Sequence, residues 1–335
     1  MHEAAQHTDE TRLDGPLLFG RVLDGRGGAR RIDWAEAKSW TPGAPGEVLW
    51  LHLCRTVDGV QDWLEGLGIP EPTAEFLIGN DMRPRAFRED DTLVANLRGI
   101  NFNPGAHPED MIAFQIWSDG ARIFTFRRRR LQSPRDVLAA LDAGRGPKDS
   151  GQVVTQLIEA VVSRMSIAIV DMNEAIDAME KDGANSDVGQ LLDKIAIIRR
   201  NSLALQRHMA PQHEALEAVA SEAPAWFEAD DRREIADSID RLRRYLEDIN
   251  ISKESALMLQ DDLRARALAR SERTNYMLTI VAAIFLPLGF LTGLLGINVG
   301  GMPGVDDGDA FWIVVVLCGL IMAMQIALFW KWKWL

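Results

Sequence analysis

Several residue types and motifs are scarce in this chain of 335 residues, and each scarcity excludes a class of protein. Two cysteines, Cys54 and Cys318, cannot build a disulfide framework, and no CxxC or CxxCH spacing exists for zinc or haem. Basic residues are also few: 37 Lys+Arg stand against 49 Asp+Glu, and the net charge of −12 argues against nucleic-acid binding. Because the sequence has no phosphate loop, nucleophile elbow or HExxH motif, we expect neither an enzyme nor a bound cofactor.

Charged side chains are absent from two long stretches near the C-terminal end. Thr274–Val305 contains no Asp, Glu, Lys or Arg, and the predominantly apolar segment Tyr276–Gly296 lies within it. A second uncharged run covers Phe311–Trp330. At 1.5 Å per residue, each run spans about 30 Å, the hydrocarbon thickness of a bilayer. We therefore expect a transmembrane domain over 274–335, with spans at 276–296 and 311–330, an outer loop at 297–310 and a tail at 331–335.

The charges that flank the two spans predict their orientation. Residues 263–273 carry a net +3 and the tail a net +2, whereas the loop between the spans carries −3. Positive flanks mark the cytoplasmic side, and the N-terminal residues lack the apolar core of a signal peptide. Both termini should therefore lie in the cytoplasm, on the inner side of the inner (plasma) membrane. The remaining residues, 1–262, form a strongly acidic cytoplasmic body with a net charge of −14.

Residues 1–148 are expected to form a cytoplasmic α/β domain. Gly, Pro and Asp turns separate β-rich apolar runs at Leu17–Leu23, Val48–Leu53, Leu93–Ile100, Met111–Trp117 and Ile123–Phe126. Short helical patterns lie near Val60–Leu67, Thr73–Ile78 and Pro134–Leu141. A Gly, Pro and Ser-rich segment over 144–151 then marks a boundary.

Residues 149–273 are expected to form a helical funnel and stalk, which makes the whole an α+β membrane protein. Residues 152–182 contain neither Gly nor Pro, a second helix fits Gln190–Ala210, and 225–286 run 62 positions without either breaker. A single helix from residue 225 to Gly296 would be roughly 100 Å long. The stalk carries an apolar seam that must pack against copies of itself or against the preceding helices: Ile235, Ile239, Leu242, Leu246 and Ile249.

The first span ends in Gly296-Ile297-Asn298, followed by a glycine-rich turn that reaches Gly304. Glycine lets backbone carbonyls approach a cation, and the Asn298 amide offers a neutral oxygen, so this segment suits the mouth of an ion pathway. Three loop carboxylates would concentrate cations outside the mouth: Asp306, Asp307 and Asp309. By composition alone, a flexible turn between two helices fits the segment equally well.

These residues resemble the CorA superfamily of divalent metal ion transporters. The similarity lies in Phe285-Leu286-Pro287 within the first span, in the Gly-x-Asn terminus at 296–298, and in the basic tail Lys331–Leu335. The magnesium branch usually carries Gly-Met-Asn, whereas Gly-Ile-Asn followed by Gly-Gly-Met-Pro-Gly is similar to the ZntB zinc-transporter branch. Trp50–Leu53 and Ala210–Gln212 also resemble that branch.

The resemblance implies a homopentamer with a funnel-shaped cytoplasmic part and a pore lined by five copies of the first span. It further implies Zn²⁺ as the transported ion, with Cd²⁺, Ni²⁺ or Co²⁺ as further candidates. As in the ZntB branch, it also implies zinc uptake coupled to the proton gradient. Gly296, Ile297 and Asn298 would then be the selectivity mouth.

Helical spacing predicts which face of the first span lines the pore. Steps of three and four back from Gly296 give a stripe of small and polar side chains that includes Leu286 as an apolar constriction: Asn275, Thr279, Ala282, Leu286, Gly289 and Gly293. Large apolar side chains off the stripe suit lipid or the second span: Ile280, Ile284, Leu288, Leu291 and Leu295. The alternative is that the small residues of the stripe pack against the second span.

Three further groups are candidate cytoplasmic metal sites. His52 and Cys54 share one face of a predicted strand, although ordinary packing explains such a pair as well. His208 and His213 flank a predicted helix break at Pro211. A zinc or proton sensor there would also involve Glu214 and Glu217, unless the site is only an exposed, solvated helical junction. An acidic group would attract divalent cations, unless it is only a solvated helix face: Glu228, Asp230, Asp231, Glu234, Asp237 and Asp240.

Two other functions compete with zinc transport. A Mg²⁺, Co²⁺ or Ni²⁺ channel of the same fold differs in having Met where this chain has Ile297. A membrane-anchored helical scaffold would leave the mouth and the polar stripe without a role. Zinc transport accounts for more of these features than either alternative.

Overall fold

The computed structural model describes residues 15–44, 46–80, 83–107, 109–182, 187–297, 304 and 308–332. Its contacts divide the chain into two units, Met1–Gln260 and Asp261–Leu335. The first unit holds a mixed sheet and the helices that cover it, and helix α8 begins in this unit and ends in the second. The domain boundary expected at 148/149 falls inside the first unit and stays a prediction.

The sheet has seven strands in the described residues, in the order β2-β1-β3-β7-β6-β5-β4. All neighbours are antiparallel except β3 and β7, which run parallel. The strands are β1 (Leu17–Leu23), β2 (Ala29–Arg31), β3 (Val48–Cys54), β4 (Arg85–Glu89), β5 (Thr92–Gly99), β6 (Ile112–Ser118) and β7 (Arg122–Arg127). The five strands expected from the sequence are confirmed, and β2 and β4 are additions at the two edges.

Short helices and strand side chains form the core on one face of the sheet. Leu49, Leu51 and Leu53 alternate along β3 and pack with Phe124 and Phe126 of the parallel neighbour β7. Four helices lie between these strands in the chain or directly after them: α1 (Trp34–Lys38), α2 (Val60–Gly66), α3 (Glu71–Ile78) and α4 (Ser133–Asp142). Buried residues of α1, α2 and α3 belong to the same core, so the expected α/β domain is present.

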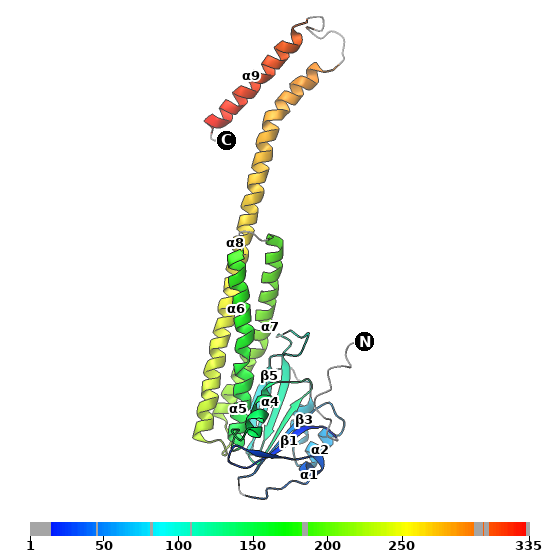
Figure 1. Cartoon of the computed structure of the whole chain (residues 1–335), viewed down its shortest axis with the longest axis vertical. Coiled ribbons are helices and arrows are strands. Elements are labelled where there is room, and N and C mark those ends of the chain that lie inside the picture. Colours follow the sequence, from blue (N-terminus) through cyan, green and yellow to red (C-terminus); the bar gives the residue numbers. More distant parts are fainter. Residues whose placement is uncertain are drawn as a thin grey trace. The chain divides into compact units, whose positions relative to one another are not determined.

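Long helices complete the first unit. They are α5 (Ser150–Ser163), α6 (Met165–Asp182), α7 (Val188–Ser221) and α8 (Ala229–Leu295), and Figure 1 shows α6, α7 and α8 running alongside one another. The predicted seam of α8 is buried within the chain at Ile235, Leu242 and Ile249. Side-chain hydrogen bonds join α8 to its neighbours, including Arg199 to Gln260 at 2.8 Å and Gln206 to Asn250 at 3.1 Å. The preceding helices therefore cover the seam.

Helix α7 corrects the expected break at Pro211. The helix continues ten residues beyond this proline to Ser221 because its far end is held against the sheet. Gln212 is buried, and its Oε1 accepts a hydrogen bond from the backbone N–H of Arg98 in β5 at 2.6 Å. Packing of this kind outweighs the one backbone hydrogen bond that a proline removes.

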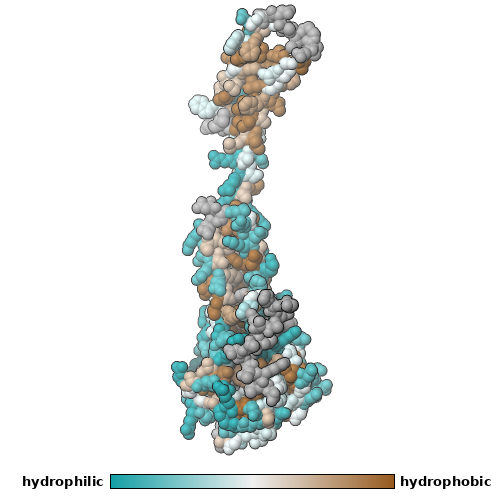
Figure 2. Space-filling model, turned by 45° about the vertical axis from the view of Figure 1, so that its right-hand side comes forward, coloured by the Kyte–Doolittle hydropathy of each residue, from teal (hydrophilic) through white to brown (hydrophobic). Residues whose placement is uncertain are grey.

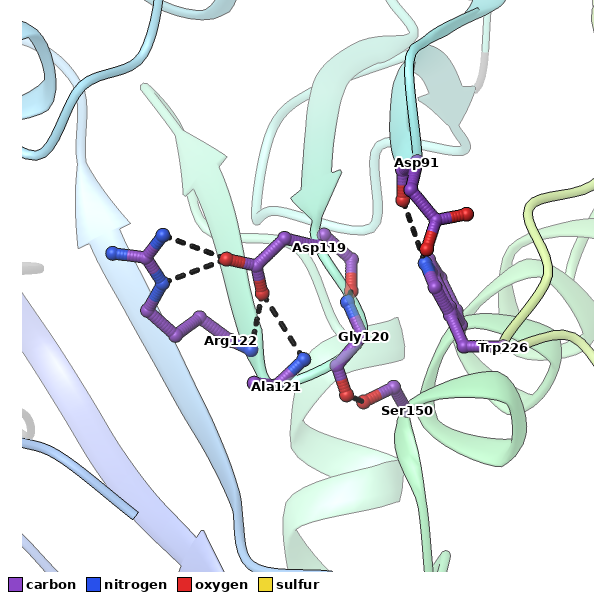
Figure 3. A network of polar contacts seen from close by, with 8 residues as sticks. Asp91, Asp119, Gly120, Ala121, Arg122, Ser150 and Trp226 are labelled. Carbon is purple, nitrogen blue, oxygen red and sulfur yellow. Dashed lines mark hydrogen bonds and ion pairs between the residues drawn. The ribbon is translucent and has the colours of Figure 1, made fainter.

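A polar network ties the β6–β7 turn to the start of α5 (Figure 3). The carboxylate of Asp119 accepts from the backbone N–H groups of Ala121 and Arg122 and pairs with the Arg122 guanidinium at 2.6 Å. Ser150 donates its hydroxyl to the carbonyl of Gly120. The turn is thereby fixed against the first residue of α5, and the sheet and the long helices form one packed unit.

Candidate ion pathway

Three helices in the described residues are long and apolar enough to span a membrane. One, Ser150–Lys181, is 56% buried over its most apolar stretch and packs inside the first unit. The other two, α8 (Ala229–Leu295) and α9 (Ala310–Lys331), bury none of theirs. Figure 2 shows apolar side chains gathered over this pair of helices. The C-terminal end of α8 and nearly the whole of α9 therefore cover the two expected spans.

The C-terminal part of α8 packs on α9 through one side only. Half-buried residues of α8 recur at helical spacing at Ile280, Ala283, Ile284, Leu288 and Leu291. Half-buried or buried residues of α9 recur in the same way: Ala310, Val314, Cys318, Ile321, Gln325 and Phe329. Of the five large residues expected to face lipid or the second span, four are half-buried on this side. The fifth, Leu295, is exposed.

The predicted stripe lies on the uncovered side of α8. All six of its residues are exposed in the chain: Asn275, Thr279, Ala282, Leu286, Gly289 and Gly293. A Cβ placed on Gly289 or Gly293 would meet no atom within 4 Å outside its own helical turn. Neither glycine therefore packs against α9 of the same chain, and the pore-lining role of the stripe stays a prediction. Leu286, the expected constriction, has 73% of its surface exposed.

The predicted mouth begins where α8 ends. Helix α8 ends at Leu295, and the backbone N–H of Gly296 donates to the carbonyl of Gly293 at 3.2 Å. Asn298, Asp306 and Asp307 lie outside the described residues. Asp309 precedes α9, and its carbonyl accepts from the N–H of Ile313 at 3.2 Å. The selectivity role of Gly296, Ile297 and Asn298 remains a prediction.

The structure places His52 and Cys54 in different surroundings. His52 is 2% exposed, its ring lies near Phe19 and Phe114, and its Nδ1 hydrogen-bonds the Thr125 hydroxyl at 2.9 Å. Burial and nearby arginines, including Arg127, hold the pKa of His52 well below its usual value. Cys54 lies at the end of β3, with its Sγ 3.2 Å from the Thr56 hydroxyl. The neutral imidazole is therefore engaged within the core of the sheet.

The helical histidines do not form a pair. His208 and His213 are five positions apart on the continuous α7, so their side chains point about 140° apart around the helix axis. Burial lowers the pKa of His208, and the charges of Arg98 and Arg207 lower it further. Nδ1 of His213 lies 3.8 Å from the carboxylate of Glu217. Glu214 pairs instead with Arg83 at 3.6 Å.

The acidic group at the start of α8 is divided among different partners. Asp230 pairs with Arg233 at 3.3 Å and Asp240 with Arg243 at 2.7 Å, both on the exposed side of α8. Glu234 accepts a hydrogen bond from the Thr155 hydroxyl of α5 at 2.7 Å. Glu228 and Asp237 are exposed. Five of the six carboxylates are exposed and Asp231 alone is buried, so most of this group forms a solvated helix face. Attraction of divalent cations by the group stays a prediction.

Asp231 is the buried member of this group, at 3% exposure. It occupies the first turn of α8, and its Oδ2 accepts from the backbone N–H of Glu228 at 2.8 Å, as in a helix capping box. Burial, opposed by the hydrogen bond from the N–H of Glu228 and reinforced by the charge of Asp149, raises the pKa of Asp231 to about 6. No side chain would fit on Gly151 of α5, because its Cβ would overlap this carboxylate. Asp231 thus stabilises a helix start at an electrostatic cost.

Within the described residues, no three His, Cys, Asp or Glu side chains come together as a metal-binding group. The residues brought into one arrangement are those of the α8 stripe and those of the α8–α9 contact. One polar member of this contact, Gln325, was not predicted from the sequence. Its only sequence signal is that it is the one carboxamide in an uncharged span.

Comparison with known proteins matches this architecture to a family of membrane proteins. The family described as CorA-like Mg²⁺ transporter protein matches residues 45–331. The chain belongs to the CorA-like family. This membership confirms the resemblance that the terminus of the first span and the basic tail indicate.

Characterised relatives cover nearly the whole CorA-like chain. The divalent cation transporter CmaX of Pseudomonas aeruginosa is 36% identical over 95% of this chain and 97% of its own. The zinc transport protein ZntB of Yersinia pseudotuberculosis is 32% identical over 95% of this chain and 96% of its own.

Solved structures share the fold. The full-length CmaX structure has a TM-score of 0.83 at 35% identity, covering 98% of this chain and all of that one. The CorA magnesium transporter of Methanocaldococcus jannaschii has a TM-score of 0.78 at 14% identity, covering 94% and 98%. The α/β domain, the long helix and the two C-terminal apolar helices are therefore those of this fold.

Proposed function

We propose that this protein is a divalent-cation transporter, and that Zn²⁺ is its principal substrate. The ion would pass along the stripe of α8, between copies of the chain arranged as a homopentamer. Both termini would lie in the cytoplasm and the loop between α8 and α9 on the other side of the inner membrane. The protein would not be an enzyme.

The observation that carries this proposal is the uncovered stripe of small and polar residues on α8 within the membrane segment. Four of its large apolar side chains are half-buried on the side of α9, and the small and polar side chains of the stripe, such as Thr279 and Gly289, remain uncovered. Other large apolar side chains, such as Phe285 and Phe290, are uncovered as well and suit lipid or further helices. A polar face in a transmembrane helix costs free energy in lipid, so it is expected to face water or other helices. Copies of α8 around a central axis would satisfy this requirement and would form a water-filled path.

Zinc is favoured over magnesium by two observations on the chain and its relatives. Ile297 stands where the magnesium branch usually has Met, and one relative with 32% identity is named a zinc transport protein. Magnesium is the second candidate because the matching family is described by that ion. Proton coupling is part of the zinc proposal and follows the ZntB branch.

Metal flux into proteoliposomes tests the proposal. The purified full-length protein would be reconstituted, and the initial rates for Zn²⁺ and Mg²⁺ would be measured with and without a pH gradient. We expect Zn²⁺ to enter faster than Mg²⁺, and the rate to rise with protons moving in the same direction. Preferred Mg²⁺ flux that ignores the pH gradient would reassign the substrate, and absence of any metal flux would favour the scaffold.

A further inference from the structure

Helix α9 contains a single carboxamide within its uncharged membrane segment. Gln325 lies among apolar residues from Phe311 to Trp330. It occupies the side of α9 that packs on α8, in line with Ile321 and Phe329. A polar group in hydrocarbon is costly unless a hydrogen bond satisfies it, so the contact that Gln325 makes is informative.

Pro287 leaves one backbone carbonyl of α8 without its helical partner. Proline has no N–H, and in an α-helix the N–H of residue 287 would donate to the carbonyl of Ala283, four positions earlier. Nε2 of Gln325 donates to this same carbonyl at 3.2 Å. The second span therefore supplies the hydrogen bond that proline removes from the first.

The rest of the Gln325 amide argues for a specific role of this bond. Its Oε1 is buried and has no hydrogen-bond partner in the part of the chain that the structure describes. A leucine of similar size would avoid that cost and would pack against the same apolar neighbours. What an amide provides at this position, and a leucine would not, is therefore the hydrogen bond that Nε2 donates to the carbonyl of Ala283.

We propose that Gln325 is a positioning residue for the pore helix. By bonding the carbonyl of Ala283, it holds the interrupted turn of α8 against α9 and fixes the orientation of Leu286, the neighbour of Pro287 on the uncovered side. This inference rests on the proposed function, because Leu286 matters only if that side lines the ion path. The bond thus acts on the side of α8 that faces α9, and its effect reaches Leu286 on the uncovered side through the one backbone turn that they share.

A double-mutant cycle on the full-length protein tests the inference. Gln325→Leu removes the donor, and Pro287→Ala restores the N–H that α8 needs to satisfy the Ala283 carbonyl by itself. Initial Zn²⁺ and Mg²⁺ flux into proteoliposomes and the thermal unfolding midpoint would be measured for all four combinations. Met324→Leu is the matched control, because Met324 is the adjacent residue of α9 and is 67% exposed.

The expected result is a loss that depends on the proline. Gln325→Leu should lower the initial rate about threefold or more and lower the unfolding midpoint when Pro287 is present. In the Pro287→Ala background the same change should have little effect, and Met324→Leu should have little effect in either. A pure packing role would give equal losses in both backgrounds, and that result, or no loss beside Pro287, would overturn the inference.

The two readouts separate this inference from the proposed function. Absence of metal flux in the unaltered protein would refute transport. The unfolding midpoints of the four variants would still report whether the Gln325 bond replaces the one that Pro287 removes. If Gln325→Leu leaves metal flux normal, and the effects of the two substitutions on the unfolding midpoint add, the positioning role is refuted while transport stands.

Discussion

Replacing Asp231 by Asn should stabilise the protein in a pH-dependent way. The folded chain raises the pKa of this carboxyl from 3.8 to about 6. The folded state therefore binds the proton more tightly than the unfolded state, and the protein loses stability as pH rises from about 4 to about 6. After solvent screening of the carboxylate is allowed for, this difference in pKa corresponds to about 2 kcal/mol. Asn cannot ionise and keeps an oxygen that can accept from the N–H of Glu228.

The assay is thermal unfolding of the detergent-solubilised protein, followed by tryptophan fluorescence between pH 4 and 8. We expect Asp231→Asn to raise the midpoint by about 5 °C above pH 7 and to have little effect near pH 4. Asp237→Asn is the control, because it removes the same charge from an exposed position of the same helix. A gain that is equal at both pH values, or a loss above pH 7, would refute the argument from burial.

Three further predictions concern the membrane helices and the sheet domain. Gly289→Leu should lower metal flux at least tenfold by filling the proposed path, whereas Gly319→Leu, at an equally open glycine of α9, should change it less than twofold. Leu286→Gly should raise metal leak in the absence of a gradient of protons, and unchanged leak would count against a constriction there. Gly120→Ala should lower the free energy of unfolding by about 1–3 kcal/mol, because its φ is +88° and a Cβ would meet an indole carbon at 2.8 Å. Gly25→Ala, with φ +71° and open space, should cost less in the same unfolding assay.

The strands predicted from the sequence were those with many apolar residues. β3 and β7 alternate or run apolar because both faces of the sheet are covered, and this pattern is visible without a structure. The edge strands β2 and β4 were missed because each is short and carries two arginines. Edge strands are often charged, so their identity comes from hydrogen bonds to a neighbour and not from composition.

For the long helices, local sequence patterns predict some features and miss those that depend on distant segments. A single helix from residue 225 to Gly296 was expected, and α8 does continue through Pro287. The course of α7 through Pro211 was not expected, because the contact of Gln212 with β5 comes from a segment more than a hundred positions away. The same reasoning explains Asp231, whose burial depends on how α5 and α8 pack together.

The membrane helices were largely predictable by side-chain size and polarity. The stripe that those properties predict is uncovered in the structure, and Ile280, Ile284 and Leu288 are half-buried on the other side. Large side chains such as Phe285 and Phe290 are uncovered too, so size alone does not separate the two sides. The bond from Gln325 to Ala283 was beyond sequence analysis. It depends on the register between two helices that no local pattern specifies.

Cysteine accessibility along residues 275–296, measured in actively transporting proteoliposomes, tests the central claim most directly. Cys54 and Cys318 would first be replaced by serine and alanine in a variant that retains flux. We expect water-soluble thiol reagents to label, and to block flux at, the positions of the stripe: Asn275, Thr279, Ala282, Leu286, Gly289 and Gly293. Uniform labelling around the helix, or labelling confined to Ile280, Ile284 and Leu288, would contradict the account.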